Sequence, residues 1–397
     1  MRIETFEMER MQSTWENRVA ANLSESGVHP MTTRELLGED DAAALLDEPL
    51  AYTQSNGTIP LRERIAALYP GASVDQIQVT NGGSEANFVS LWHLVEPGDE
   101  IVMMTPNYMQ GWGLVRGFGG QVREWKLQLQ RGGAERGVGA PRATEPGGVQ
   151  GSPPRGEARY HADVDELDTL VTPKTKLILI CAPNNPTGAR FDETVLNGVA
   201  AAADRVGAWI LSDEIYRGAE RDGVESPSIW GLSERAIVTS GLSKAYGLPG
   251  LRIGWIVAPA ELVARTWSYH DYTTIAPGAA SDFLARLALE PARRARIIER
   301  TRGVIRENYP VLETWLAQQG CFEWAAPDAG AICYAKYDLP IASLPLAERL
   351  RDEESVLIVP GAHFGMEGYV RIGFGNDRPT LEDGLARISR FIARLTR

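Results

Sequence analysis

Between residues 60 and 244 the chain alternates short apolar runs with segments of helical periodicity. Strands are expected at 76–80, 100–106, 176–183, 208–216 and 236–244, and helices after residue 83, after Tyr108 and over 192–206. The run KLILICAP, at 176–183, is apolar almost throughout, which is typical of a strand buried on both faces of a parallel sheet. This alternation predicts an α/β fold with a mostly parallel central sheet flanked by helices.

The two ends of the chain follow a different pattern. After about residue 280, long helical segments are mixed with short strands, and the last helix carries apolar residues at helical spacing from Leu381 to Leu395. Phe6, Met11 and Trp15 predict a docking helix over residues 4–20. We therefore predict a large domain over 45–275 and a smaller α+β domain built from 1–44 and 276–397.

Residues 130–159 interrupt the pattern of the large domain. They are rich in glycine, proline and arginine and contain no aromatic residue. Such a segment buries too little apolar surface to offset the entropy of ordering it. We predict a flexible surface insertion here.

Charge and cysteine content exclude several classes of protein. The net charge of −12 disfavours binding to nucleic-acid phosphates, so we expect no nucleic-acid partner. Cys181, Cys321 and Cys333 form no CxxC pair, which fits a reducing compartment. The N-terminus lacks the apolar core of a signal peptide, and no run of about 18 apolar residues exists. We expect a cytoplasmic protein with no membrane partner, and predict no metal site.

Polar side chains follow several predicted strands where the strands end. Because ligands of open α/β sheets bind at the carboxyl ends of the strands, these groups are expected to converge. Gly82, Gly83 and Ser84 stand at a strand-to-helix turn, where free backbone N–H groups attract anions. Arg252 adds a planar guanidinium that suits phosphate. Together they predict a phosphate cup.

The other groups at these strand ends point to a small aromatic ligand. Asp213 lies in the apolar run WILSDEIY, where a carboxylate is costly unless a cation pairs with it. A protonated pyridine nitrogen is such a cation, and Asn185 and Tyr216 are neutral groups suited to a phenolate oxygen. Phosphate, pyridinium and phenolate on one ring describe pyridoxal phosphate. Lys244 is then the amine that forms a Schiff base with its aldehyde.

The motifs TNGGSEA, TPNYMQ, APNNPTG, LSDEIY, SGLSKAYGLPGLRIGW and GYVRIGF occur in this order and cover about residues 45–375. In this combination the chain resembles the class I/II aminotransferases of the fold-type-I pyridoxal-phosphate-dependent superfamily. The resemblance implies that Lys244, Asp213 and Tyr216 carry the catalysis. It assigns the cofactor to the following residues: Gly83, Ser84, Tyr108, Asn185, Asp213, Tyr216, Ser243, Lys244, Arg252 and Tyr52.

The resemblance also implies the subunit arrangement and the substrate contacts. Tyr52 resembles the tyrosine that reaches the phosphate of the neighbouring subunit, which implies a homodimer with shared active sites. Gly27 and Asn185 are expected beside the substrate. Arg371 lies in YVRIGF, opposite the apolar face formed by Val370 and Ile372, and its guanidinium suits bidentate capture of a substrate carboxylate.

Two segments depart from the pattern of the family. Gly241 stands where the family often has a serine or threonine that binds phosphate, so either Ser243 or Ser240 takes that role, or the cup has one hydroxyl fewer. LSESGVHPMT replaces the usual N-terminal pattern, and Glu25, Ser26 and His29 would change the polarity of the substrate wall. His29 is either an acid/base group or an ordinary hydrogen-bonded residue.

We expect a pyridoxal-phosphate-dependent aminotransferase, and one alternative reaction shares all these residues. The expected reaction is transamination between an L-amino acid and a 2-oxo acid, with Lys244 moving the α proton, which requires an amine of lowered pKa. The alternative is a lyase or cyclase reaction that expels a β or γ substituent, and LSESGVHPMT resembles the corresponding part of cyclases such as capreomycidine synthase. A cofactor-sensing regulator is disfavoured because the short, acidic N-terminal segment shows no helix-turn-helix pattern.

Overall fold

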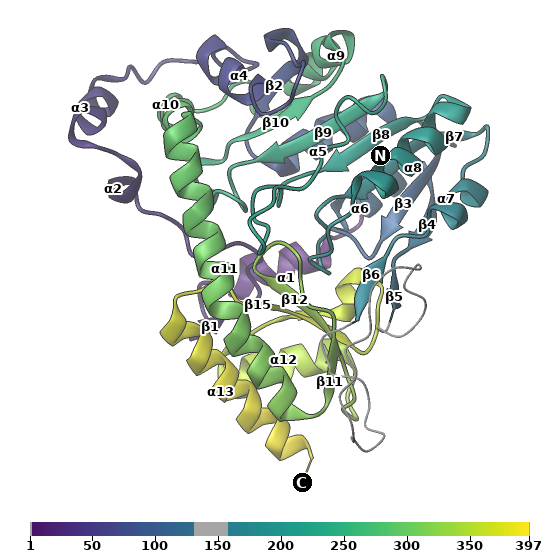
Figure 1. The fold of residues 1–397 in the computed structure, drawn as a ribbon, viewed down its shortest axis with the longest axis vertical. Helices are drawn as coiled ribbons and strands as arrows, with labels where there is room; N and C mark the ends of the chain where they lie inside the picture. The colour runs from purple at the N-terminus through teal and green to yellow at the C-terminus, as the bar shows by residue number, and fades with distance from the viewer. Residues whose placement is uncertain (1, 131–157, 397) are drawn as a thin grey trace, which may run out of the picture.

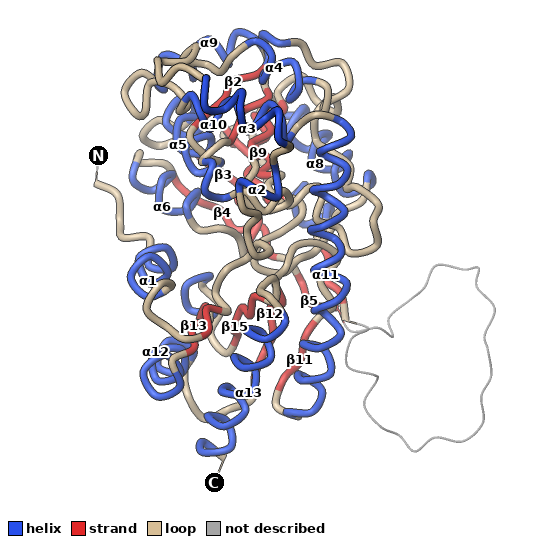
Figure 2. Tube along the Cα trace, turned by 90° about the vertical axis from the view of Figure 1, so that its left-hand side faces the viewer, coloured by secondary structure: helices blue, strands red, loops and turns tan. Residues whose placement is uncertain are grey.

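The computed structural model describes residues 2–130 and 158–396 (Figures 1 and 2). The predicted insertion at 130–159 falls almost wholly outside the described residues. Its first and last residues, Gln130 and Arg159, are instead paired with each other as the ends of β5 (Gln128–Gln130) and β6 (Arg159–His161). The described residues thus show a two-stranded antiparallel ribbon at the two ends of this segment, and the predicted insertion stays a prediction.

The predicted parallel sheet is a seven-stranded sheet with the order β2-β10-β9-β8-β7-β3-β4. Its strands are β2 (Ile77–Thr80), β3 (Glu100–Thr105), β4 (Gln121–Lys126), β7 (Thr175–Cys181), β8 (Trp209–Asp213), β9 (Ala236–Gly241) and β10 (Gly254–Val257). Only β10 runs antiparallel to its neighbours in this sheet. The start of β10 therefore lies at the same edge as the carboxyl ends of the other six strands.

Helices cover both faces of this sheet. Ile101 and Met103 pack on one side with residues of α5 (Gly83–Leu94), α6 (Gln110–Gly117) and α9 (Ala260–His270). Val102 and Met104 pack on the other side with α4 (Ile59–Ala66), α7 (Val164–Leu170) and α8 (Glu193–Val206). Because each face has its own apolar core, the central strand β7 is apolar almost throughout, as the sequence predicted for residues 176–183, whereas the edge strand β4 is largely polar.

A second sheet is four-stranded and antiparallel, with the order β11-β12-β15-β14. Its strands are β11 (Phe322–Trp324), β12 (Ile332–Tyr337), β14 (Val359–Pro360) and β15 (Tyr369–Gly373), and α12 (Ser343–Glu354) and α13 (Arg378–Leu395) accompany them. The long helix α11 (Pro291–Gln319) runs alongside both parts of the molecule (Figure 1). Three further helices are α2 (Thr33–Leu36), α3 (Glu39–Asp47) and α10 (Ala279–Ala288). The domain boundaries at 44/45 and 275/276 stay a prediction.

The N-terminal helix is shorter than predicted. It is α1 (Glu7–Trp15), and a short strand β1 (Ala21–Asn22) follows it and pairs with β13 (Val356–Leu357). Its buried residues are Met8 and Gln12 rather than the predicted apolar stripe. The Gln12 side chain donates hydrogen bonds to the carbonyl and hydroxyl oxygens of Ser24, so a polar contact orients this helix.

Within the part of the chain that the structure describes, no helix is long and apolar enough to cross a membrane. The cytoplasmic location stays a prediction.

Candidate active site

A cavity of about 310 Å³ opens at the edge of the large sheet where its parallel strands end. Ten of the predicted site residues line it: Gly83, Ser84, Tyr108, Asn185, Asp213, Tyr216, Ser243, Lys244, Arg252 and Arg371. They come from segments spread over almost 300 residues of sequence, and the topology of the sheet brings them together. Three residues of α1 and the residue that follows it also line the cavity, which the sequence did not predict: Met8, Glu9, Gln12 and Glu16, here called the α1 wall.

The predicted phosphate cup is formed by the reversed strand β10 and the start of α5. Arg252 lies two residues before the start of β10. It therefore reaches the same edge of the sheet as Gly83 and Ser84. Gly82 has φ +93°, and a Cβ there would lie 2.1 Å from Nη2 of Arg252, so only glycine allows this close approach. The Arg252 guanidinium also lies 3.5 Å from the hydroxyl of Ser243.

A steric reason explains why position 241 is a glycine rather than the serine or threonine that the family often has there. A Cβ at this position would lie 2.7 Å from the carbonyl oxygen of Ile253 in the neighbouring strand. Ser240 donates a hydrogen bond to the carbonyl of Glu214 and does not line the cavity. Of the two serines that the sequence left open, Ser243 is the one that faces the cavity.

Asp213 ends β8 as a partly buried carboxylate. It accepts hydrogen bonds from Asn87 Nδ2 at 2.9 Å and from the backbone N–H of Ile215 at 3.1 Å. Burial raises the pKa of Asp213, although both hydrogen bonds oppose the rise. Among the described residues no Lys, Arg or His pairs with it. A cationic ligand group at this point would relieve the cost of burying the charge.

Asn87 is a site residue that sequence reasoning missed. Its Oδ1 accepts a hydrogen bond of 2.6 Å from Thr239, which directs its amide group toward Asp213. Asn87 lies four residues after Gly83 on α5, so both face the cavity from one side of the helix. That spacing was readable in the sequence motif NGGSEAN.

Lys244 lies at the centre of a hydrogen-bonded cluster. Its Nζ donates to Oε1 of Glu25 at 2.5 Å, and the Tyr216 hydroxyl donates to Ser26 at 2.8 Å. Burial alone would lower the pKa of Lys244, but the adjacent Glu25 carboxylate outweighs it and raises the pKa. The sequence expectation of a lowered amine pKa is therefore wrong for this structure, because Glu25 compensates the charge. Burial raises the pKa of Tyr216 to about 12, against the opposing charges of Lys244 and Arg371.

Arg371 lies in β15 and is 1% exposed. Nη1 donates to Asn185 Oδ1 at 2.8 Å, and Nη2 donates to the carbonyl of Ser24 at 2.7 Å. Its Nε is buried without a hydrogen-bond partner among the described residues. Burial lowers the pKa of Arg371. A buried guanidinium with spare donor capacity at a cavity wall is suited to bind a carboxylate.

Four other residues that the sequence analysis singled out differ in their relation to the cavity: Tyr108, Gly27, Tyr52 and His29. The Tyr108 hydroxyl donates to Glu9 at 2.9 Å, which links the strand edge to α1. A Cβ on Gly27 would lie 3.4 Å from Cδ of Lys244, so Gly27 adjoins the lysine. Tyr52 does not line the cavity and is 87% exposed. His29 hydrogen-bonds with the carbonyl of Gly375 and also lies outside the cavity lining.

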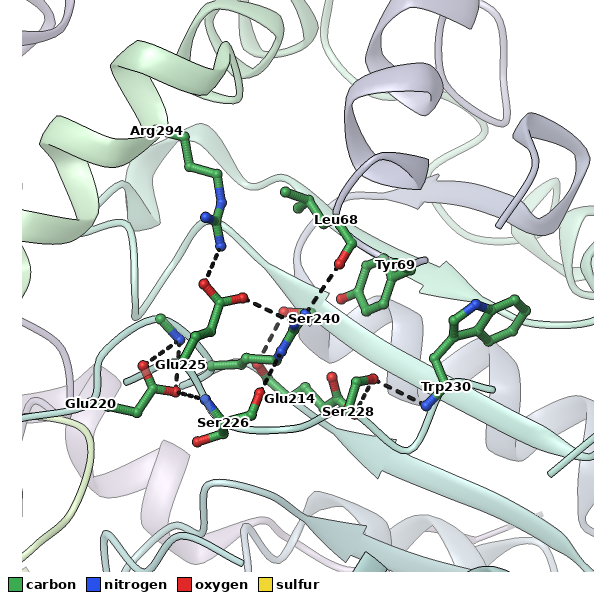
Figure 3. A network of polar contacts seen from close by, with 12 residues as sticks. Leu68, Tyr69, Glu214, Glu220, Glu225, Ser226, Ser228, Trp230, Ser240 and Arg294 are labelled. Atoms are coloured by element: carbon green, nitrogen blue, oxygen red, sulfur yellow. Dashed lines mark hydrogen bonds and ion pairs between the residues drawn. The ribbon is translucent and has the colours of Figure 1, made fainter. Parts of the chain in front are cut away.

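Glu214, next in the chain to Asp213, belongs to a separate polar network (Figure 3). It accepts hydrogen bonds from Ser228 and from the backbone N–H of Ile229, and burial raises its pKa to about 7. Elsewhere in the network, Glu225 forms an ion pair with Arg294 of α11, with 2.9 Å between Oε2 and Nη2. These contacts attach the loop that carries Tyr216 to the long helix.

A family model for aminotransferases of class I and II matches residues 39–388. The chain belongs to this family. It is 32% identical to capreomycidine synthase of Streptomyces vinaceus, over 93% of this chain and 88% of that protein. It superposes on a pyridoxal-phosphate-dependent aminotransferase of Streptococcus suis with TM-score 0.87 and 31% identity, over 100% and 99% of the two chains. The cyclase OrfR gives TM-score 0.83 and 26% identity, over 99% and 98%.

Membership of the class I and II aminotransferases confirms the predicted family and fold-type-I architecture, and it implies pyridoxal phosphate as cofactor. The cavity fits this group. The carboxylate of Asp213, which no cation among the described residues contacts, suits a pyridinium nitrogen, and the close glycine–arginine contact at Gly82 and Arg252 suits a phosphate. No group of three or more His, Cys, Asp or Glu that could hold a metal occurs in 2–130 or 158–396.

Proposed function

We propose that this protein is a pyridoxal-phosphate-dependent enzyme that removes the α proton of a positively charged amino acid and then expels or replaces a substituent of its side chain. The observation that carries this proposal is the lining of one cavity by Lys244, Arg371 and the carboxylates of the α1 wall. The predicted catalytic and cofactor-binding roles are part of the proposal.

The chain's own residues would divide the work as follows. Arg371 and Asn185 bind the substrate carboxylate, and Nζ of Lys244 takes the proton from the α carbon. Pyridoxal phosphate, held by Asp213, Asn185, Tyr216 and the Ser84–Ser243–Arg252 cup, would supply the electron sink for the electrons left at that carbon. Those electrons would form a double bond between the α and β carbons as a β substituent leaves with its bonding electron pair, and a proton from the site would neutralise the leaving group.

The substrate class follows from the acidic residues of the α1 wall. Glu16 lines the cavity, and within the described residues no cation pairs with it. Burial, followed by repulsion from Glu25 and Glu9, raises the pKa of Glu16. A cationic side chain of the substrate would compensate this charge. The distal carboxylate of a dicarboxylic 2-oxo acid would instead be repelled, which disfavours 2-oxoglutarate as an amino acceptor.

Transamination between an L-amino acid and a 2-oxo acid is the second candidate. It is favoured by the similarity over the full chain to the Streptococcus suis aminotransferase. Elimination or cyclisation is favoured by the similarity to capreomycidine synthase and by the acidic wall. A transaminating enzyme with this cavity would need an acceptor without a second carboxylate.

Incubation of the holoenzyme with a panel of amino acids, without and then with 2-oxo acids, tests both candidates. Cationic amino acids that carry a β-hydroxyl group are expected to lose it without any acceptor, as mass spectrometry would show. Arginine-type substrates should exceed their citrulline counterparts, which have the same shape without the charge, by about 10- to 100-fold in kcat/KM. Product formation only with an acceptor would establish transamination instead, and a preference for acidic side chains would contradict the proposed role of α1.

We also propose a homodimer. The segments 46–59 and 272–275 carry several strongly exposed apolar side chains, among them Leu46, Leu50, Tyr52 and Tyr272. Thr53 donates a hydrogen bond to the carbonyl of Pro277, so the two segments adjoin each other. An exposed patch of this kind is typical of an interface. Sedimentation of the holoenzyme should give twice the chain mass, and a monomer would contradict both the dimer and the reach of Tyr52 into a neighbouring site.

A further inference from the structure

Glu25 is the only carboxylate that contacts the lysine at the centre of the cavity, as far as the described residues show. We propose that Glu25 is a positioning residue that holds Lys244 as an ammonium group in the cofactor-free enzyme and thereby sets the pH at which the lysine can capture the cofactor. The inference rests on the proposed function only in taking Lys244 as the capturing amine, and it does not depend on which reaction follows.

The position of the Glu25 carboxylate is fixed by the backbone around it. Its Oε1 accepts hydrogen bonds from the backbone N–H groups of Ser26 at 2.9 Å and Gly27 at 2.8 Å, in addition to Lys244. An oxygen held by two backbone donors stays a carboxylate and does not need the lysine to hold it in place. The contact is therefore a feature of the loop rather than a chance pairing of two long side chains.

The loop itself has almost no freedom relative to the rest of the site. A Cβ on Gly373 would lie 2.0 Å from the carbonyl oxygen of Glu25, and a Cβ on Gly375 would lie 2.1 Å from that of Gly27. Both glycines are needed for the loop to pack this closely on the end of β15 and the residues after it. The loop is also fixed through the hydrogen bond from Tyr216 to Ser26. The backbone that carries Glu25 is thus held by close packing on β15, and its Oε1 by two backbone N–H groups.

The groups that face Lys244 act in opposite directions. Burial and the positive charge of Arg371 lower the pKa of Lys244, whereas Glu25, by its charge and its hydrogen bond, and Tyr216 raise it. Glu16 lies farther away and interacts with Lys244 through its charge. Among these groups Glu25 is the carboxylate in direct contact. Its removal leaves burial and Arg371 dominant, so the amine should become neutral at a lower pH.

Charge on this amine controls cofactor capture because only the neutral amine attacks an aldehyde carbon. In the attack, the nitrogen lone pair forms the new C–N bond, the carbonyl oxygen leaves as water, and the proton held at Nζ must first move away. Glu25 is the nearest acceptor for that proton. The side chain of Lys244 is 24% exposed, so small reagents in the cavity can reach it.

The test measures the amine directly in the cofactor-free enzyme. Lys244 is labelled with trace acetic anhydride across pH 6–11, and its labelled peptide is quantified by mass spectrometry. In the wild type, the labelling midpoint of Lys244 should lie above that of the exposed Lys174 in the same sample. In Glu25→Gln the midpoint should fall by about one pH unit or more, which means roughly tenfold faster labelling near pH 8. Absorbance should show faster uptake of pyridoxal phosphate to match.

Glu348→Gln makes the same change on the exposed surface of α12 and should leave the labelling midpoint of Lys244 unchanged. Glu25→Asp keeps the charge, so its Lys244 midpoint should stay nearer to that of the wild type than the midpoint in Glu25→Gln. A Lys244 midpoint below that of Lys174 in the wild type would overturn the inference even if Glu25→Gln did not fold. An unchanged midpoint in folded Glu25→Gln would overturn it as well. If the midpoint shifts as expected but no variant takes up pyridoxal phosphate, the proposed function fails while the Glu25–Lys244 coupling stands.

Discussion

Replacement of Lys244 by alanine is expected to lower kcat by roughly 10⁴-fold or more. The variant loses both the amine that captures the cofactor and the group that moves the α proton. The visible absorption of lysine-bound cofactor should disappear in the same preparation. Steady-state kinetics and absorption spectra of the purified protein measure the two effects independently.

Lys174→Ala provides the control, because this lysine lies exposed on the surface, and it should retain both the absorption band and the activity. Added small amines should restore part of the activity of Lys244→Ala, since they replace the missing proton acceptor. Normal turnover of Lys244→Ala without an added amine would refute the assignment of the lysine.

Asp213→Asn is expected to lower kcat/KM by about 10²- to 10⁴-fold, which corresponds to the 3–5 kcal/mol that loss of one partner costs a buried ion pair. The amide keeps the size of the side chain and still accepts a hydrogen bond from Asn87. It does not neutralise a pyridinium proton, so the cofactor becomes a weaker electron sink and is held less tightly. Equilibrium dialysis of the cofactor and initial rates measure the two losses.

Glu214→Gln is the matched control for Asp213→Asn. Glu214 is the next acid in the chain and is 1% exposed, but its partners belong to the network of Figure 3 rather than to the cavity. We expect Glu214→Gln to retain activity and cofactor affinity. Equal losses in the two variants would mean that burial of acids in this loop, and not a contact with the cofactor, explains the effect at Asp213.

The large sheet and its site residues were readable from the sequence because both depend on local patterns. Apolar runs such as 176–183 mark strands that are covered on both faces, and the residues that follow them meet at one edge by the rule for parallel strands. Lys244 and Asp213 were predicted in this way. Arg252 reaches the same edge only through the antiparallel direction of β10, which the sequence pattern did not reveal.

The α1 wall and the Glu25 contact were not predictable because they are tertiary contacts between distant segments. Glu25 and Lys244 are separated by 219 positions, and no periodicity links them. Glu9 and Glu16 read as ordinary solvent-facing acids of an N-terminal helix. The docking of Gln12 on Ser24 and the hydrogen bond from Tyr108 to Glu9 show that this helix turns acidic residues toward the cavity.

The cavity thus has two walls of different origin. One is built into the sheet edge, where the backbone of Gly254 lies so close to that of Gly82 that a Cβ would lie 2.3 Å from its carbonyl carbon. The other belongs to a nine-residue helix that is held by the buried side chain of Met8 and by polar contacts such as that of Gln12 with Ser24. Evolution toward new substrates can therefore change the sequence of α1 while the residues at the sheet edge stay the same. Chimaeras that exchange only α1 between relatives are the natural route to altered specificity.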